Sequence, residues 1–123
     1  ACLDIAAQLL PKIKFKKSRM QAAANEGYLN ATDLADYLVT KGMPFREAHH
    51  CVGQIVRYAV SKGKEIQELS LAELQQFSDC IEAEIFDFLT TQQMIDRRTT
   101  IGGTATRAVR AAIKTAEKKL KKC

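Results

Sequence analysis

Residues that break helices are scarce in this sequence, and so are long apolar stretches. Its 123 residues include two prolines, six glycines and no tryptophan. Because few residues interrupt a helix, and because Ala, Leu, Lys, Glu and Gln are abundant, the composition favours helix. No apolar run approaches the roughly 20 residues of a membrane helix, so the sequence predicts no membrane-spanning helix within these residues. The length suits one domain, and the sequence predicts an all-α one.

Metal-binding and disulfide motifs are also missing. The four cysteines are widely spaced: Cys2, Cys51, Cys80 and Cys123. No Cys-x-x-Cys pair occurs, and no His stands at the spacing of a zinc ligand. The adjacent His49 and His50 would point about 100° apart on a helix, so they cannot share one metal ion. We therefore expect no metal site and reduced thiols, with Cys51 and Cys80 as small core residues.

The net charge of +5 is unevenly distributed. Residues 12–19 carry five basic residues and no acid, and residues 107–122 carry seven basic residues and one acid. The stretch between them, residues 20–106, holds seven basic residues and twelve acids. A nucleic-acid-binding domain more often concentrates its basic residues on the helix that reads the bases. The basic ends are instead typical of solvated helix faces, without the interleaved aromatics of a single-strand binder.

The first ten residues, "ACLDIAAQLL", give two expectations about the start of the chain. The basic residues follow the apolar ones, whereas a signal peptide has the reverse order. The first residue is not Met. We therefore expect no signal peptide, and we expect that residue 1 is not a natural start.

Apolar spacings of three and four residues indicate seven helices and one short turn over residues 90–98. The expected helices cover residues 3–10, 18–25, 30–41, 44–62, 70–77, 81–89 and 105–120. In the fourth helix the expected core stripe is Phe45, Ala48, Val52, Ile55, Val56 and Ala59. In the last helix it is Ala105, Val109, Ala112, Ile113, Ala116 and Leu120.

Side chains that can cap helices precede several of these segments. Ser70 with Glu73 has the spacing of a capping box, and Thr90 with Gln93 has a weaker version of it. Ser, Asn and Thr accept the free N–H groups of a first turn, so further caps are expected at Ser18, Asn30 or Thr32, and Thr104.

The sharp corner at Gly42-Met43-Pro44, called the elbow below, raises the possibility of a DNA-binding helix-turn-helix. Such a motif would place residues 44–62 in the major groove, with base contacts from the first turn. The candidate reading residues are Phe45, Arg46, His49 and His50. One arginine, two histidines and an apolar residue make a poor reading face. Helix pairs joined at a glycine turn are also ordinary packing units.

Other candidate chemistry is sparse. "IGGTA", residues 101–105, could hold a phosphate at a helix N-terminus, but it lacks the lysine of a P-loop and follows no strand, so we interpret it as a tight turn. The acids Glu82, Glu84 and Asp87 are interpreted as an exposed face that aids solubility. No Ser or Cys has an identifiable His partner and orienting acid, so no nucleophilic site is predicted.

Three stretches follow one another in the order of known motifs. "ATDLA" at residues 31–35 leads to "KGMPFREAH" at residues 41–49 and then to Val52-Gly53. "LSLAELQQFS" covers residues 69–78, and "RRTTIGGTA" covers residues 97–105. Together they resemble the C-terminal domain of the argininosuccinate lyase family, over nearly the whole chain. Thr106 departs from the family, which usually has Pro there, and His50 stands where the family often has an acid.

The resemblance implies a longer parent enzyme of the fumarase and aspartase superfamily. That parent would cleave argininosuccinate to arginine and fumarate as a cytoplasmic homotetramer. It would use no metal or redox cofactor and bind neither nucleic acid nor membrane. No segment here resembles the family's Ser-Met-Pro-Lys-Asn loop, so no catalytic or substrate-binding residue is carried over onto this chain.

The resemblance also implies an architecture. Residues 1–17 would be the end of a long central-bundle helix and a linker, and residues 18–123 would form a domain of two packed helix-turn-helix units. The elbow is then structural, and the domain would shape or close the active-site entrance. Cut off from the bundle, residues 3–10 would leave apolar side chains without cover. A free-standing helix-turn-helix module that binds nucleic acid is the alternative.

Overall fold

The computed structural model describes residues 2–121, and all of its regular secondary structure is helical. No strand occurs within those residues, which confirms the all-α class. The α-helices are α1 (Cys2–Leu9), α2 (Lys17–Ala24), α3 (Ala31–Thr40), α4 (Phe45–Lys62), α5 (Leu71–Gln75), α6 (Ile85–Phe88), α7 (Thr91–Asp96) and α8 (Thr106–Leu120). Two short 3-10 turns are η1 (Leu10–Lys12) and η2 (Ile66–Glu68).

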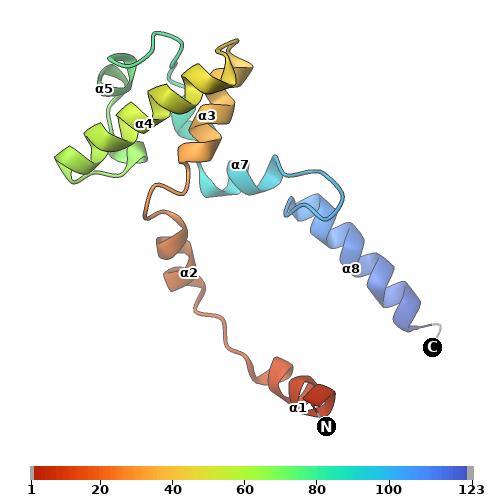
Figure 1. The fold of residues 1–123 in the computed structure, drawn as a ribbon. Helices are drawn as coiled ribbons and strands as arrows, with labels where there is room; N and C mark the ends of the chain where they lie inside the picture. The colour runs from red at the N-terminus through yellow and green to blue at the C-terminus, as the bar shows by residue number, and fades with distance from the viewer. Residues whose placement is uncertain (1, 122–123) are drawn as a thin grey trace.

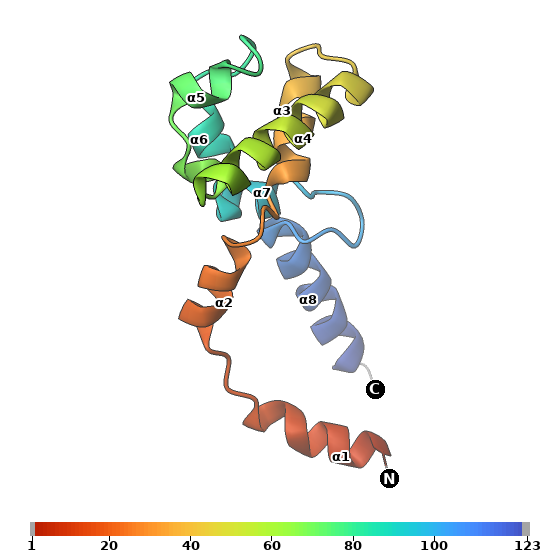
Figure 2. The same cartoon turned by 60° about the vertical axis from the view of Figure 1, so that its left-hand side comes forward.

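The helices form one cluster with two arms. Helices α3 to α7 lie together, and α3 and α4 cross at its centre (Figure 1). The N-terminal arm, α1 and α2, and the C-terminal arm, α8, both leave the same side of this cluster (Figures 1 and 2). None of the helices that the structure describes is long and apolar enough to cross a bilayer.

The core lies inside the cluster, between α3, α4 and the segments that follow them. Its members are buried apolar side chains: Leu34, Ala35, Tyr37, Leu38, Ala48, Cys51, Val52, Ile55, Ala59, Ile66, Leu69, Leu74, Ile81, Ile85 and Leu89. Tyr37 packs edge-on against Phe88, and Tyr58 packs edge-on against Phe77. Such aromatic pairs add directional contacts to the burial of apolar area.

The elbow joins α3 and α4 as the sequence indicates. Gly42 has a φ of +97°, a conformation that glycine adopts without steric cost. The Met43 N–H donates to the Leu38 carbonyl, which closes the end of α3. Pro44 lies just before α4 and not within its first turn, and its carbonyl accepts from the Ala48 N–H at 2.9 Å. The corner is therefore a compact packing turn.

Two of the expected caps are confirmed. Ser70 accepts from the Glu73 N–H, and the Glu73 carboxylate accepts from the Ser70 N–H, so the capping box is complete. Thr90 accepts from the Gln93 N–H and begins α7.

The other expected caps are wrong. Ser18 lies inside α2, which begins at Lys17 without a side-chain cap. Asn30 is at the cap position of α3, but its side chain is turned to Gln67 instead. Helix α8 begins after Ala105, and Asp96 takes the role predicted for Thr104 by accepting from the Thr106 N–H. In each case a tertiary contact or an earlier helix start replaced the local cap.

Two expected apolar stripes are not buried as predicted. Phe45 is 64% exposed, so it lies outside the α4 stripe whose members Ala48, Val52, Ile55 and Ala59 are buried. Helix α8 has a clear apolar side, yet none of its residues is buried. The apolar residues of α1 are also exposed, which agrees with the expectation that Leu3 and Leu9 lack cover in this chain.

Candidate functional site

A groove lies between α3 and α4, the two helices that the elbow joins, and is called the elbow groove below. Its volume is about 260 Å³, and it is lined by Ala31, Thr32, Ala35, Phe45, His49, Val52, Gly53 and Val56. The Phe45 and His49 rings lie beside each other, with centroids 6.3 Å apart, and His50 is exposed. The groove therefore offers an apolar surface with one imidazole, which suits docking of another apolar surface more than base reading.

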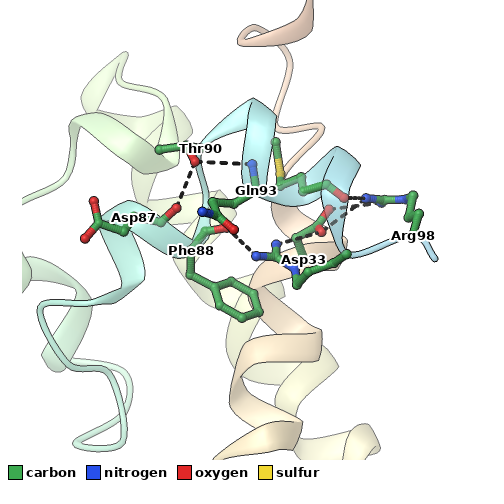
Figure 3. Close-up of polar contacts among 8 residues, drawn as sticks. Asp33, Asp87, Phe88, Thr90, Gln93 and Arg98 are labelled. Carbon is green, nitrogen blue, oxygen red and sulfur yellow. Dashed lines mark hydrogen bonds and ion pairs between the residues drawn. The ribbon is translucent and has the colours of Figure 1, made fainter. Parts of the chain in front are cut away.

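A buried polar group of the cluster is Asp33, which the sequence analysis treated only as part of a motif. Its carboxylate is 6% exposed and receives two guanidinium groups. Arg97 Nη2 donates to Oδ1 at 3.1 Å, and Arg98 Nη2 donates to Oδ2 at 3.2 Å. Figure 3 shows Asp33 on α3 and Arg98, just after α7, pointing toward each other. One carboxylate of the first turn of α3 thus holds the end of α7.

Both arginines are fixed by further contacts. Arg97 Nη1 donates to the Phe88 carbonyl at 2.9 Å, and its guanidinium lies 3.5 Å from the centre of the Phe88 ring. Arg98 also donates to the Met94 carbonyl. Stacking on an aromatic face and paired N–H donors are what a guanidinium provides and an ammonium does not. The cluster of Asp33, Arg97 and Arg98 is therefore a structural junction, in which the buried carboxylate is paired with both arginines.

A second charged cluster joins α3 to the segment before α6. Lys41 Nζ lies 2.9 Å from a Glu82 oxygen and 2.7 Å from a Glu84 oxygen. The buried Tyr37 hydroxyl accepts from the Glu82 N–H at 3.2 Å and donates to Glu84 at 3.4 Å. Glu82 and Glu84 are exposed as interpreted, but they precede α6 instead of lying on a helix, and their carboxylates also pair with Lys41.

Charge pairing shifts the ionisation of these groups. The hydrogen bond from Lys41 lowers the pKa of Glu84, and the bonds to Glu84 and Glu82 raise the pKa of Lys41. Both shifts favour the charged forms near neutral pH. The paired charges therefore join α3 to the segment before α6.

The turn before α8 bounds an open depression of about 770 Å³. Three of its lining residues are basic, Arg107, Arg110 and Lys114, on one face of α8. Its acid, Asp96, has a lowered pKa, first because Gln92 donates to it and then because Thr106 does. Gly102 has a φ of +81°, and the Gly103 N–H donates to the Thr100 carbonyl at 2.8 Å, so "IGGTA" is a tight turn as interpreted.

The cysteines divide between core and surface. Cys51 is buried as expected, and burial raises the pKa of its thiol. Cys80 is exposed, so the expectation that it is a core residue is wrong. Cys2 is an exposed free thiol, and Cys123 lies outside the described residues. Within residues 2–121, no three His, Cys, Asp or Glu side chains are grouped so as to hold a metal ion.

The Glu73 carboxylate gives a testable pH dependence. Hydrogen bonds from the Ser70 N–H and hydroxyl lower its pKa to about 2. A carboxyl whose pKa is lower in the folded state stabilises the fold above its unfolded pKa, and this contribution is lost as the pH falls through the folded value. We expect wild type to be more stable than Glu73→Gln at pH 6, with the difference shrinking from about pH 4.5 to pH 2.

Urea unfolding at pH values between 2 and 6 tests this expectation. The measured quantity is the difference between the unfolding midpoints of wild type and Glu73→Gln. Glu47→Gln, which removes an exposed carboxylate from α4, is the control and should give no comparable trend. A wild-type advantage that stays constant down to the lowest pH would contradict the assigned role of Glu73.

Comparison with known proteins accounts for this arrangement. The family model for the C-terminal region of argininosuccinate lyase matches residues 28–96. An argininosuccinate lyase from Desulfatibacillum aliphaticivorans is 49% identical over 120 residues, which are 98% of this chain and 26% of that protein. The chain thus spans about a quarter of the length of this relative.

Solved structures show the same fold. EDDS lyase with bound formate, and a double variant of EDDS lyase with bound fumarate, each superpose with a TM-score of 0.77 at 34% identity. Each comparison covers 86% of this chain and 23% of the other. The matched region 28–96 holds the elbow, the core and the Lys41 cluster. The chain belongs to the argininosuccinate lyase family and corresponds to its C-terminal region.

Proposed function

We propose that this chain is the C-terminal domain of a lyase that cleaves argininosuccinate to arginine and fumarate. The observation that carries the proposal is the 49% identity to an argininosuccinate lyase over 98% of the chain. The relationship to EDDS lyase supports a carbon–nitrogen lyase of this superfamily, since fumarate is bound in one of those structures. The complete enzyme would work in arginine biosynthesis as a cytoplasmic homotetramer without a cofactor.

Within that enzyme the role of this domain is structural. The conspicuous charged groups of the cluster, Asp33 and Lys41, are already paired with neighbouring side chains. We therefore assign no catalytic or substrate-binding residue to this chain. Residues 1–17 would be the end of a central-bundle helix and a linker, and residues 18–123 would shape or close the active-site entrance. The apolar elbow groove gives this domain a surface for contact with the rest of the enzyme.

The experiment compares three proteins in an assay for fumarate release from argininosuccinate. The proteins are the complete enzyme, the same enzyme ending before residue 18, and the isolated chain. We expect turnover by the first only, because the reacting groups lie outside this chain and their site needs its entrance domain. Turnover by the isolated chain would contradict the absence of catalytic residues, and an inactive complete enzyme would contradict the proposed substrate.

The variant Phe45→Ala in the complete enzyme sharpens this test. Phe45 is 64% exposed in the elbow groove, so its removal should leave the domain folded. If the groove contacts the remaining enzyme, argininosuccinate cleavage should fall while the melting temperature of the isolated chain stays the same. Val60→Ala, at another exposed apolar residue outside the groove, is the matched control. Equal activity of both variants would show that the groove is not the contact surface.

A further inference from the structure

The turn between α2 and α3, residues 25–30, is held in a strained conformation. Gly27 has a φ of +76°, and Tyr28 has a φ of +58°. Glycine adopts such values freely, but they are unfavourable for a bulky aromatic residue. Tyr28 is the one residue other than glycine with a positive φ in the described part of the chain. Strain of this kind persists only where surrounding contacts hold the backbone in place.

The Glu65 carboxylate provides those contacts. The Gly27 N–H donates to its Oε1 at 3.1 Å, and the Tyr28 N–H donates to its Oε2 at 3.2 Å. Two successive backbone donors are thus gathered by the two oxygens of one ionisable group. The Tyr28 hydroxyl donates to the neighbouring Lys64 carbonyl at 3.2 Å. Because hydrogen bonds to a charged acceptor are stronger than neutral ones, Glu65 is the main restraint on the turn.

A second set of bonds ties the two ends of the same turn to the cluster. Gln67 donates to the Asn25 carbonyl at 3.0 Å and accepts from the Asn30 side chain at 2.9 Å. The Thr91 hydroxyl, at the start of α7, donates to the Asn25 side chain at 2.6 Å. Asn30 is only 5% exposed, so this end of the turn is fixed inside the cluster.

The turn controls the direction of the N-terminal arm. Neither α1 nor α2 has a buried residue, so little packing holds the arm against the cluster. Figures 1 and 2 show the arm leaving the cluster at this turn. We propose that residues 25–30 are a latched hinge, in which the Glu65 carboxylate holds the turn in its strained conformation and so sets the angle between the N-terminal arm and the helical cluster.

The consequence for activity rests on the proposed function. If the arm continues the central bundle of a lyase, its angle to the cluster sets how the entrance domain is placed over the active site. With the latch closed, the cluster keeps one position. With the latch open, Tyr28 relaxes to a negative φ, and the angle between the N-terminal arm and the cluster can change. The hinge would then be the element through which this domain opens and closes the entrance.

Amide exchange of Gly27 and Tyr28, measured by NMR in the 123-residue chain, tests the latch directly. Glu65→Gln replaces one accepting oxygen with an NH₂ group that faces a backbone donor. We expect the two amides to exchange at least about tenfold faster, because a bond to a charged acceptor is lost. Small-angle X-ray scattering should show a larger radius of gyration as the arm is released. Glu26→Gln, which removes an exposed charge within the turn but no bond that holds it, is the matched control and should change neither measurement.

Tyr28→Phe is a second and independent variant, since it removes only the bond to the Lys64 carbonyl. We expect roughly threefold faster exchange at the same amides, in keeping with a neutral hydrogen bond. Circular dichroism establishes whether each variant keeps its helix content. If Glu65→Gln has a lower helix content, the exchange rates of Tyr28→Phe alone test the latch. Unchanged exchange in both variants, or equal acceleration in Glu65→Gln and Glu26→Gln, would overturn the latch. These measurements need no turnover, so their failure is distinct from a failure of the proposed lyase activity.

Discussion

Replacing Asp33 with Asn is expected to lower the melting temperature of this chain by roughly 10 °C. The substitution keeps the shape of the side chain but removes the charge that pairs with Arg97 and Arg98. Two guanidinium groups would then lie together without their acid. Removing one partner of a fully buried ion pair costs about 3–5 kcal/mol. Because the arginines are partly exposed, we expect a smaller cost of about 2–3 kcal/mol.

A matched control is available on the same helix. Asp36 lies one turn further along α3 and is exposed, so Asp36→Asn removes the same charge without breaking the junction. Thermal unfolding followed by circular dichroism should show a change within a few degrees for this variant, since exposed substitutions usually cost little. Equal melting temperatures for the two variants would refute the role assigned to Asp33. Hydrogen exchange should also place the loss of Asp33→Asn in α7, because that helix ends at the two arginines.

The parts of the fold that follow from local sequence were predictable. The glycine and proline of the elbow, the Ser70 capping box and the apolar period of α4 each depend on residues within a few positions of one another. Their physical causes are backbone sterics, a reciprocal pair of hydrogen bonds and the helical repeat, all of which are readable from spacing. The signals were weaker further along the chain, because the turn predicted over residues 90–98 is helix α7 and the helix predicted over residues 81–89 is only α6 (Ile85–Phe88).

The parts that depend on distant residues were not predictable from spacing. Asp33 meets Arg97 and Arg98 across 64 and 65 positions, and Lys41 meets Glu82 across 41. The local sequence pattern does not indicate which acidic side chain will pair with which basic side chain. The same limit explains the wrong cap at Thr104, because Asp96 reaches the first turn of α8 from another helix.

Amphipathic periodicity also cannot say whether an apolar side has a partner. Helix α8 carries an apolar stripe as regular as that of α4, yet of the predicted stripe only Ala105, just before the helix, is buried, and Val109, Ile113 and Leu120 are exposed. The pattern predicts the helix correctly, since the period belongs to the helix itself. Burial is decided by the surfaces that lie opposite. In a chain that spans a quarter of the matched relative, those surfaces need not be part of the same stretch of sequence.

The second large expected effect comes from a comparison of Phe45 and Ile55 in α4, because sequence and structure predict different outcomes for Phe45. The apolar period assigns both Phe45 and Ile55 to the core, whereas the structure buries only Ile55. Ile55→Ala leaves a cavity between α3 and α4, where a truncated isoleucine costs about 2–5 kcal/mol. Phe45→Ala removes a larger side chain from the surface and should cost less than about 0.5 kcal/mol.

Urea unfolding of both variants decides between the two descriptions of α4. We expect Ile55→Ala to shift the midpoint strongly toward lower urea with the slope unchanged, and Phe45→Ala to leave the midpoint near wild type. A large loss for Phe45→Ala would mean that its ring packs against the cluster, as periodicity alone suggests. A small effect of Phe45→Ala has a further consequence. An exposed aromatic residue that does not stabilise its own domain is available for contact with another surface, which is the role proposed for the elbow groove.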